Sequence, residues 1–136
     1  MNHKVYLITA KQVEFINEDV CRNSNSEHRC YDLGKIESAL HSAFYPGNYP
    51  FYHGGVAKVA GALAYYVLKA HAFLDGNKRT ALLASTAFMT LNGWELRYSM
   101  SDDGWCDLAK ILDSAAANLV NMEELKDWYD QHKIPA

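Results

Sequence analysis

The segment from Thr80 to Leu91 constrains the fold of this chain most, because apolar residues cover most of its surface at helical spacing. Its expected inward face comprises Ala81, Ala84, Phe88 and Leu91, widened by Leu82 and Met89. So broad an apolar surface is typical of a helix buried at the centre of a domain. Asn92-Gly93 is a good C-terminal stop, since both residues tolerate a left-handed backbone. We therefore expect a central helix that begins within Asp75–Lys78.

Helical patterning covers most of the remaining sequence. Thr9-Ala-Lys-Gln12 and Asn121 with Glu124 are capping boxes, and Asp32 is a third capping residue. Three of the other expected helices cover residues 10–21, 32–43 and 55–70. A further helix is expected to start at Ser101 or Asp102 and to carry Trp105, Leu108, Leu112 and Ala116. The last expected helix carries Leu125, Trp128 and Tyr129. Alternation from Trp94 to Tyr98 favours a short strand. We predict one domain, residues 1–136, of the mainly all-α class: a compact bundle of about six helices with one or two short edge strands.

Charge and composition exclude several classes of function. The net charge of −3 argues against a general nucleic-acid binder, which needs a basic surface. No apolar run is long enough to span a bilayer, and Met1–Lys4 leads into too few apolar residues for a signal peptide. The three cysteines lack metal-type spacing, so we expect reduced thiols in a cytoplasmic protein.

The residues just before the central helix carry the chemistry. His71 and Asp75 lie four apart, and Gly76-Asn77-Lys78-Arg79 opens the helix. Cations at a helix N-terminus are disfavoured by roughly 0.3–1 kcal/mol each, whereas the free N–H groups there favour an anion. A bound phosphate would relieve this conflict, with Asn77 donating from its amide and Arg79 clamping two oxygens. The alternative is that both cations are solvated or paired with surface carboxylates.

The run His71-x-Phe73-x-Asp75-Gly76-Asn77-Lys78-Arg79 resembles the signature of the Fic/Doc (Fido) superfamily, and is closest to the Doc, or death-on-curing, branch. Val5–Thr9 (a strand and cap), Ile36–Leu40 and Leu91–Trp94 also resemble that branch in order and spacing. The resemblance covers nearly the whole chain and implies the Fic/Doc-type helical bundle with a β-flap. It also implies an enzyme that takes ATP as substrate with Mg²⁺.

The resemblance assigns a role to each residue of the run. His71 would be the general base that deprotonates a target hydroxyl, Asp75 would hold Mg²⁺, and Phe73 would pin the loop against the helices. Gly76, Asn77 and Lys78 would form the anion hole, and Arg79 would grip a phosphate. Each role suits the side chain. Taken alone, however, His71 could be a core histidine and Asp75 only a helix N-cap.

Two positions bear on the reaction, one within the run and one three residues after it. AMP-transferring members usually have Gly where this chain has Lys78, and a second arginine where it has Leu82. Leu82 cannot bind phosphate, so the resemblance favours the Doc-type reaction, in which the terminal phosphate meets the acceptor and the enzyme is a protein kinase. AMP transfer (AMPylation) to a protein hydroxyl is the alternative. A catalytically inactive helical domain that binds a nucleotide or partner, and a toxin that cuts RNA, are further rivals.

The flap and the partners follow from the same resemblance. The aromatic, Pro- and Gly-rich segment Phe44–Gly55 would be the flap that docks a target chain, with Tyr49, Phe51, Tyr52 and His53 as candidates. A loop packed over the core is the alternative. Because no inhibitory Ser/Thr-to-Glu motif is found, a small separate antitoxin is expected, and the target would be a translation factor. No direct nucleic-acid or membrane partner is expected.

Overall fold

The computed structural model describes residues 5–45, 53–100 and 106–136. Within these residues it contains six helices and one two-stranded sheet. The elements are α1 (Ala10–Asn23), α2 (Leu33–Phe44), α3 (Val56–Ala70), α4 (Asn77–Leu91), β1 (Trp94–Leu96), α5 (Asp107–Ala116), α6 (Met122–Gln131) and β2 (Lys133–Pro135). The predicted mainly all-α bundle of about six helices is confirmed.

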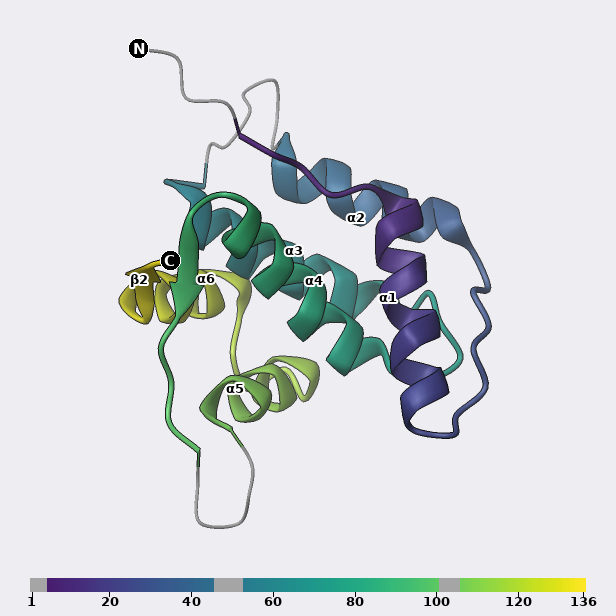
Figure 1. Ribbon diagram of the computed structural model, residues 1–136. Coiled ribbons are helices and arrows are strands. Elements are labelled where there is room, and N and C mark those ends of the chain that lie inside the picture. The colour runs from purple at the N-terminus through teal and green to yellow at the C-terminus, as the bar shows by residue number, and fades with distance from the viewer. Residues whose placement is uncertain (1–4, 46–52, 101–105) are drawn as a thin grey trace.

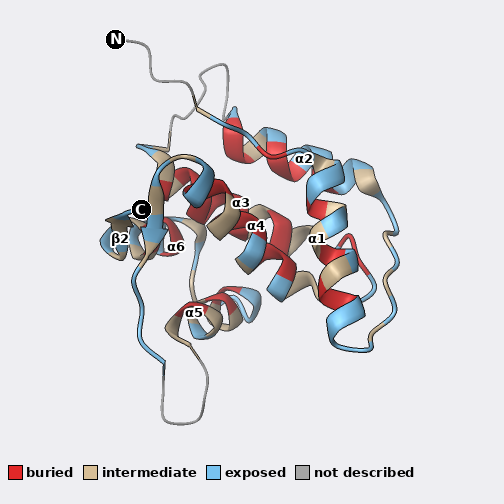
Figure 2. Cartoon of the chain, in the orientation of Figure 1, coloured by how far each residue is buried: buried red, intermediate tan, exposed pale blue. Residues whose placement is uncertain are grey.

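The core lies between α3 and α4, which run side by side at the centre of the molecule (Figure 1). Helix α3 also packs against α2 and α6, and α4 packs against α1 and α5. Buried residues are concentrated on these two central helices (Figure 2). The expected inward face of α4 is confirmed at Ala81, Ala84, Phe88 and Met89. It is wrong at Leu91, which is exposed because it ends the helix beyond the packed face.

Local capping signals set three helix starts as predicted. The Thr9 side chain accepts from the Gln12 N–H while the Gln12 side chain accepts from the Thr9 N–H, and Asn121 forms the same reciprocal box. Asp32 accepts from the Gly34 N–H. These contacts satisfy backbone donors that a helix leaves free at its first turn. Helix α1 continues to Asn23, two residues past the predicted end.

The expected strand at Val5–Thr9 is wrong. Tyr6 instead hydrogen-bonds the side chain of Asn92: its N–H donates to Asn92 Oδ1 and its carbonyl accepts from Asn92 Nδ2, both at 2.8 Å. One amide side chain thus takes the place of a pairing strand. The partner of β1 is β2, with Trp94 opposite Pro135 and Leu96 opposite Lys133 in antiparallel register. Strand β1 ends at Leu96 rather than at Tyr98.

Helix α5 begins at Asp107, later than predicted. Its N-cap is Cys106, whose Sγ accepts from the Ala109 N–H at 3.3 Å. The expected start at Ser101 or Asp102 and the inward Trp105 lie outside the described residues. Leu108 and Leu112 are buried as predicted, but Ala116 is exposed at the helix end. All three cysteines are free, and no described helix is long and apolar enough to cross a membrane.

Candidate active site

The loop between α3 and α4 holds the predicted catalytic residues, and a neighbouring segment fixes its path. Phe73 is buried, as predicted for the residue that pins the loop. The Tyr31 N–H donates to the Ala72 carbonyl at 2.8 Å, and the Leu74 N–H donates to the Arg29 carbonyl at 2.9 Å. These two bonds flank an antiparallel bridge between Cys30 and Phe73. The backbone on either side of Phe73 is therefore held as in a short sheet.

A buried amide on α1, Asn17, ties the same loop to the start of α4. Its Nδ2 donates to the Asp75 carbonyl at 2.7 Å and to Thr80 Oγ1 at 3.0 Å. Its Oδ1 lies 2.7 Å from Nδ1 of His28. Asn17 was not predicted from the sequence as part of the site. The pattern that could have indicated it is an amide on the apolar face of α1, four residues after the buried Val13.

Gly76 is the N-cap of α4 and is required there for two reasons. Its φ of 75° lies in the left-handed region, which side chains disfavour. An added Cβ would also lie 3.1 Å from Val20 Cγ1 and 3.2 Å from Asn17 Nδ2. Gly76, and not Asp75, therefore occupies the N-cap position. Asp75 Oδ1 accepts from the Gly76 N–H at 2.8 Å, which fixes the carboxylate beside the helix start.

The first turn of α4 offers unsatisfied donors. The first backbone bond of the helix is donated by the Thr80 N–H to the Gly76 carbonyl at 2.8 Å, and no side chain caps the helix. The N–H groups of residues 77–79 precede that bond and so lack a partner within the helix. The side chain of Asn77 is engaged with the backbone of Phe73, donating to its carbonyl at 2.9 Å and accepting from its N–H at 3.2 Å. What Asn77 presents at the helix start is thus its backbone N–H.

The two cations of the motif differ in their surroundings. Lys78 forms an ion pair with Asp113 of α5. Arg79 is exposed, and no carboxylate in the described parts of the chain pairs with it. Arg79 is thus the cation that remains open to a phosphate. The alternative, that the two cations are solvated or paired with surface carboxylates, also describes this arrangement, because Lys78 is paired and Arg79 is exposed, so phosphate binding stays a prediction.

A pocket of about 490 Å³ lies over this helix start. Its volume is within the range of roughly 300–1,000 Å³ that is usual for ligand sites. The lining residues come from the end of α3, the motif loop, the first turns of α4 and the face of α5: Leu68, His71, Leu74, Asp75, Gly76, Asn77, Lys78, Arg79, Leu82, Ala109 and Ala116. All but one of the predicted motif residues line the pocket, the exception being the buried Phe73.

His71 stands at the end of α3, and its side chain is exposed at the pocket. It is the C-cap of that helix, with a φ of 46°, a left-handed conformation unusual for a histidine. The residue is exposed, and no hydrogen bond to its ring occurs among the described residues. It is therefore not the satisfied core histidine that was the alternative. Cys21, buried beneath the loop, is unsuited to catalysis, because burial and the Asp75 carboxylate raise the pKa of its thiol.

Comparison with known proteins identifies the family. A family model described as the Fic/DOC family matches residues 7–89, which contain α1 to α3, the whole motif and α4 except its last two residues. The chain belongs to the Fic/DOC family. No curated protein matches the chain significantly. Fic/DOC proteins are typically enzymes that modify other proteins, and they generally use ATP with Mg²⁺.

The donors present suit the Mg²⁺ that Fic/DOC enzymes use. Among the described residues no three His, Cys, Asp or Glu side chains gather into a metal cage. Asp75 is the one carboxylate among the residues that line the pocket. Mg²⁺ is commonly bound through one or two carboxylates together with the phosphates of a substrate. Asp75 therefore fits a metal ion that arrives with a nucleotide.

Of the four predicted flap residues, the structure describes only His53. Tyr49, Phe51 and Tyr52 lie outside the described residues. His53 is half-buried and does not line the pocket. Its Nε2 is buried and has no hydrogen-bond partner among the described residues, and burial together with the nearby Lys126 ammonium lowers its pKa. The role of these four residues in target docking stays a prediction.

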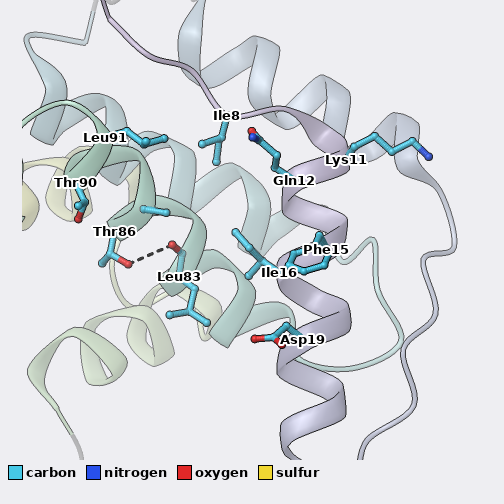
Figure 3. Close-up of a pocket in the computed structure, with 11 residues that line it drawn as sticks. Ile8, Lys11, Gln12, Phe15, Ile16, Asp19, Leu83, Thr86, Thr90 and Leu91 are labelled. Atoms are coloured by element: carbon cyan, nitrogen blue, oxygen red, sulfur yellow. Dashed lines mark hydrogen bonds between the residues drawn. The ribbon is translucent and has the colours of Figure 1, made fainter.

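A second hollow, of about 770 Å³, lies between α1 and α4 (Figure 3). The apolar side chains at its rim include Phe15 and Leu91, which are 62% and 51% exposed. It is lined by Ile8, Lys11, Gln12, Phe15, Ile16, Asp19, Leu83, Thr86, Ala87, Thr90 and Leu91. Leu83 follows Arg79 by one helical turn, so this α1–α4 groove runs along α4 toward the catalytic motif. Exposed apolar surface of this kind is typical of an interaction site.

Proposed function

We propose that this Fic/DOC protein is a kinase of the Doc branch, which transfers the γ-phosphoryl group of ATP to a hydroxyl side chain of a target protein. The observation that carries the proposal is that one pocket is lined by an exposed His71, a helix start without a side-chain cap, and Arg79, which pairs with no carboxylate among the described residues. Such a site offers a base for an alcohol and several donors for phosphate oxygens. A kinase needs both in the same place.

Each residue of the site has its own role in the proposed phosphoryl transfer. The target hydroxyl oxygen attacks the γ-phosphorus, its proton passes to the imidazole of His71, and ADP leaves with the electrons of the broken P–O bond. Arg79 and the N–H groups of the first turn of α4 stabilise the charge on the phosphate oxygens. Asp75 would hold Mg²⁺, which neutralises nucleotide charge when bound. A well-placed base contributes roughly 10²- to 10⁴-fold in rate.

Leu82 supports γ-transfer over AMP transfer. It lines the pocket one turn after Arg79, where AMP-transferring members carry a second phosphate-binding arginine. An apolar side chain offers no contact to hold the triphosphate with its α-phosphate toward His71. AMP transfer is the second candidate, because the base and the helix start would serve either reaction.

A labelling experiment separates the two reactions. The purified protein is incubated with host lysate, Mg²⁺ and ATP labelled at either the α or the γ position. We expect protein label from the γ position alone, lost in His71→Asn, which keeps a residue tolerant of the left-handed backbone. Arg79→Ala should lose label and Arg97→Ala, an exposed arginine after β1, should keep it. Label from the α position would identify AMP transfer instead, and no label from either would refute both.

We further propose that activity is restrained by a separate small antitoxin, and that the pair acts on a translation factor in the cytoplasm. The α1–α4 groove supports a helical partner, because it is mostly apolar and open, and because its lining on α4 starts at Leu83, one helical turn after Arg79. A partner helix lying there would reach the catalytic motif. Phe15→Asp, Leu83→Asp or both should abolish co-purification of a small partner from the native host and leave γ-labelling intact. Self-association of the chain that these substitutions abolish would instead assign the groove to a second copy.

A further inference from the structure

The ion pair between Lys78 and Asp113 joins α4 to α5, two helices that both contribute residues to the candidate pocket. Lys78 is the second residue of α4, and Asp113 lies on α5. Ala109 and Ala116 of α5 line the pocket. They lie four residues before and three residues after Asp113, so all three share one face of that helix. Asp113 is not itself a lining residue, but through Lys78 its carboxylate contacts a cation that lines the pocket.

The contrast with Arg79 shows what this carboxylate does. Two adjacent cations open α4; the second has no carboxylate partner in the described parts of the chain, while the first is paired across the pocket. The side chains of Lys78 and Asp113 are each 39% exposed. Ion pairs at this exposure are weak and can exchange partners. A phosphate group that enters the pocket can therefore compete with Asp113 for Lys78.

We propose that Asp113 is a resident counter-ion of Lys78, and that a phosphate group of the nucleotide takes its place on binding. The inference rests on the proposed function in that the incoming anion is a nucleotide polyphosphate. Asp113 then opposes binding because it occupies Lys78. Asp113 is therefore a positioning residue. A ligand must carry enough phosphate charge to displace it from Lys78.

The experiment is calorimetric titration of the intact protein at fixed ionic strength with Mg²⁺. The probes are ATP, inorganic tripolyphosphate and adenosine. Asp113→Asn should bind ATP and tripolyphosphate about three- to tenfold more tightly than the unmodified protein, which corresponds to loss of one weak ion pair. Its affinity for adenosine, which has no phosphate, should be unchanged.

Two further variants test the cause. Asp127→Asn removes the same charge from the Asp127–Lys58 pair between α6 and α3, and should change the affinity for ATP by less than about twofold. In a Lys78→Ala background, Asp113→Asn should lose most of its gain, because the freed cation is no longer there. Equal or weaker binding of both phosphates by Asp113→Asn would overturn the inference, as would an undiminished gain without Lys78.

The outcomes separate the inference from the proposed function. A gain with tripolyphosphate but no label from ATP in any lysate would keep the inference and refute the kinase. Normal γ-labelling with no gain in Asp113→Asn would keep the kinase and refute the inference. Absence of binding of either phosphate probe to every variant would refute both.

Discussion

The buried amide of Asn17 should account for a large part of the stability of the catalytic loop. Asn17→Ala removes the bonds donated to the Asp75 carbonyl and to Thr80 Oγ1, at 2.7 and 3.0 Å, and the 2.7 Å contact with His28. A typical hydrogen bond contributes about 0.5–1.5 kcal/mol, and a buried partner left unsatisfied costs about 1–3 kcal/mol. Since the Asp75 carbonyl is only part-buried and can turn to water, we expect unfolding free energy to fall by about 2–4 kcal/mol.

Urea denaturation followed by circular dichroism measures this loss. Asn23→Ala is the matched control, because that exposed amide lies on the same helix and, among the described residues, its side chain hydrogen-bonds Asp19 alone, at 3.5 Å. It should change the unfolding free energy by less than about 0.5 kcal/mol. In Asn17→Ala, the amide protons of Tyr31 and Leu74 should also exchange faster, because their acceptors belong to the released loop and its partner segment. A loss in Asn17→Ala no larger than in the control would refute the role given to this amide.

Three further substitutions have expected outcomes that the same denaturation assay checks. Gly76→Ala should destabilise by about 1–3 kcal/mol, because the new Cβ meets α1 at a left-handed backbone position, and should also reduce ATP affinity. Gly61→Ala should cost about 1–3 kcal/mol or more, since its Cβ would lie 2.8 Å from Lys126 Cα; a loss below 0.5 kcal/mol would show that α3 and α6 can separate freely. Tyr129→Phe should cost about 1 kcal/mol, because its buried hydroxyl lies 2.8 Å from Ser85 Oγ; an unchanged stability would mean that this bond contributes nothing net.

Local signals predicted the helical part of the fold. Thr9, Asp32 and Asn121 each cap the helix that follows within three residues, so the sequence alone contained both partners of those contacts. Contacts between distant residues could not be foreseen in this way. The pairing of Asn92 with Tyr6 joins residues 86 positions apart, and β2 forms only because β1 lies beside it.

In the candidate site, too, the parts set by neighbouring residues could be predicted, and the contacts between distant residues could not. The motif residues are contiguous, so their gathering at one pocket followed from the expected loop and helix. Asn17 is 58 positions from Asp75, and Asp113 is 35 positions from Lys78. Neither residue carries a local signal that names its partner. The side-chain amide of Asn77 was predicted to bind phosphate, whereas in the folded loop it hydrogen-bonds the backbone of Phe73.

Hydrogen bonds near the C-terminal end of α4 indicate where a label can be attached to the protein. Asn92 holds Tyr6, and the neighbouring Gly93 carbonyl accepts from the Ala136 N–H at 3.0 Å. Helix α4 has 15 residues and so spans about 22 Å from this junction to its first turn. A fluorophore or surface tether attached near Tyr6 or at Ala136 would therefore sit at the opposite end of α4 from the pocket that His71 and Arg79 line.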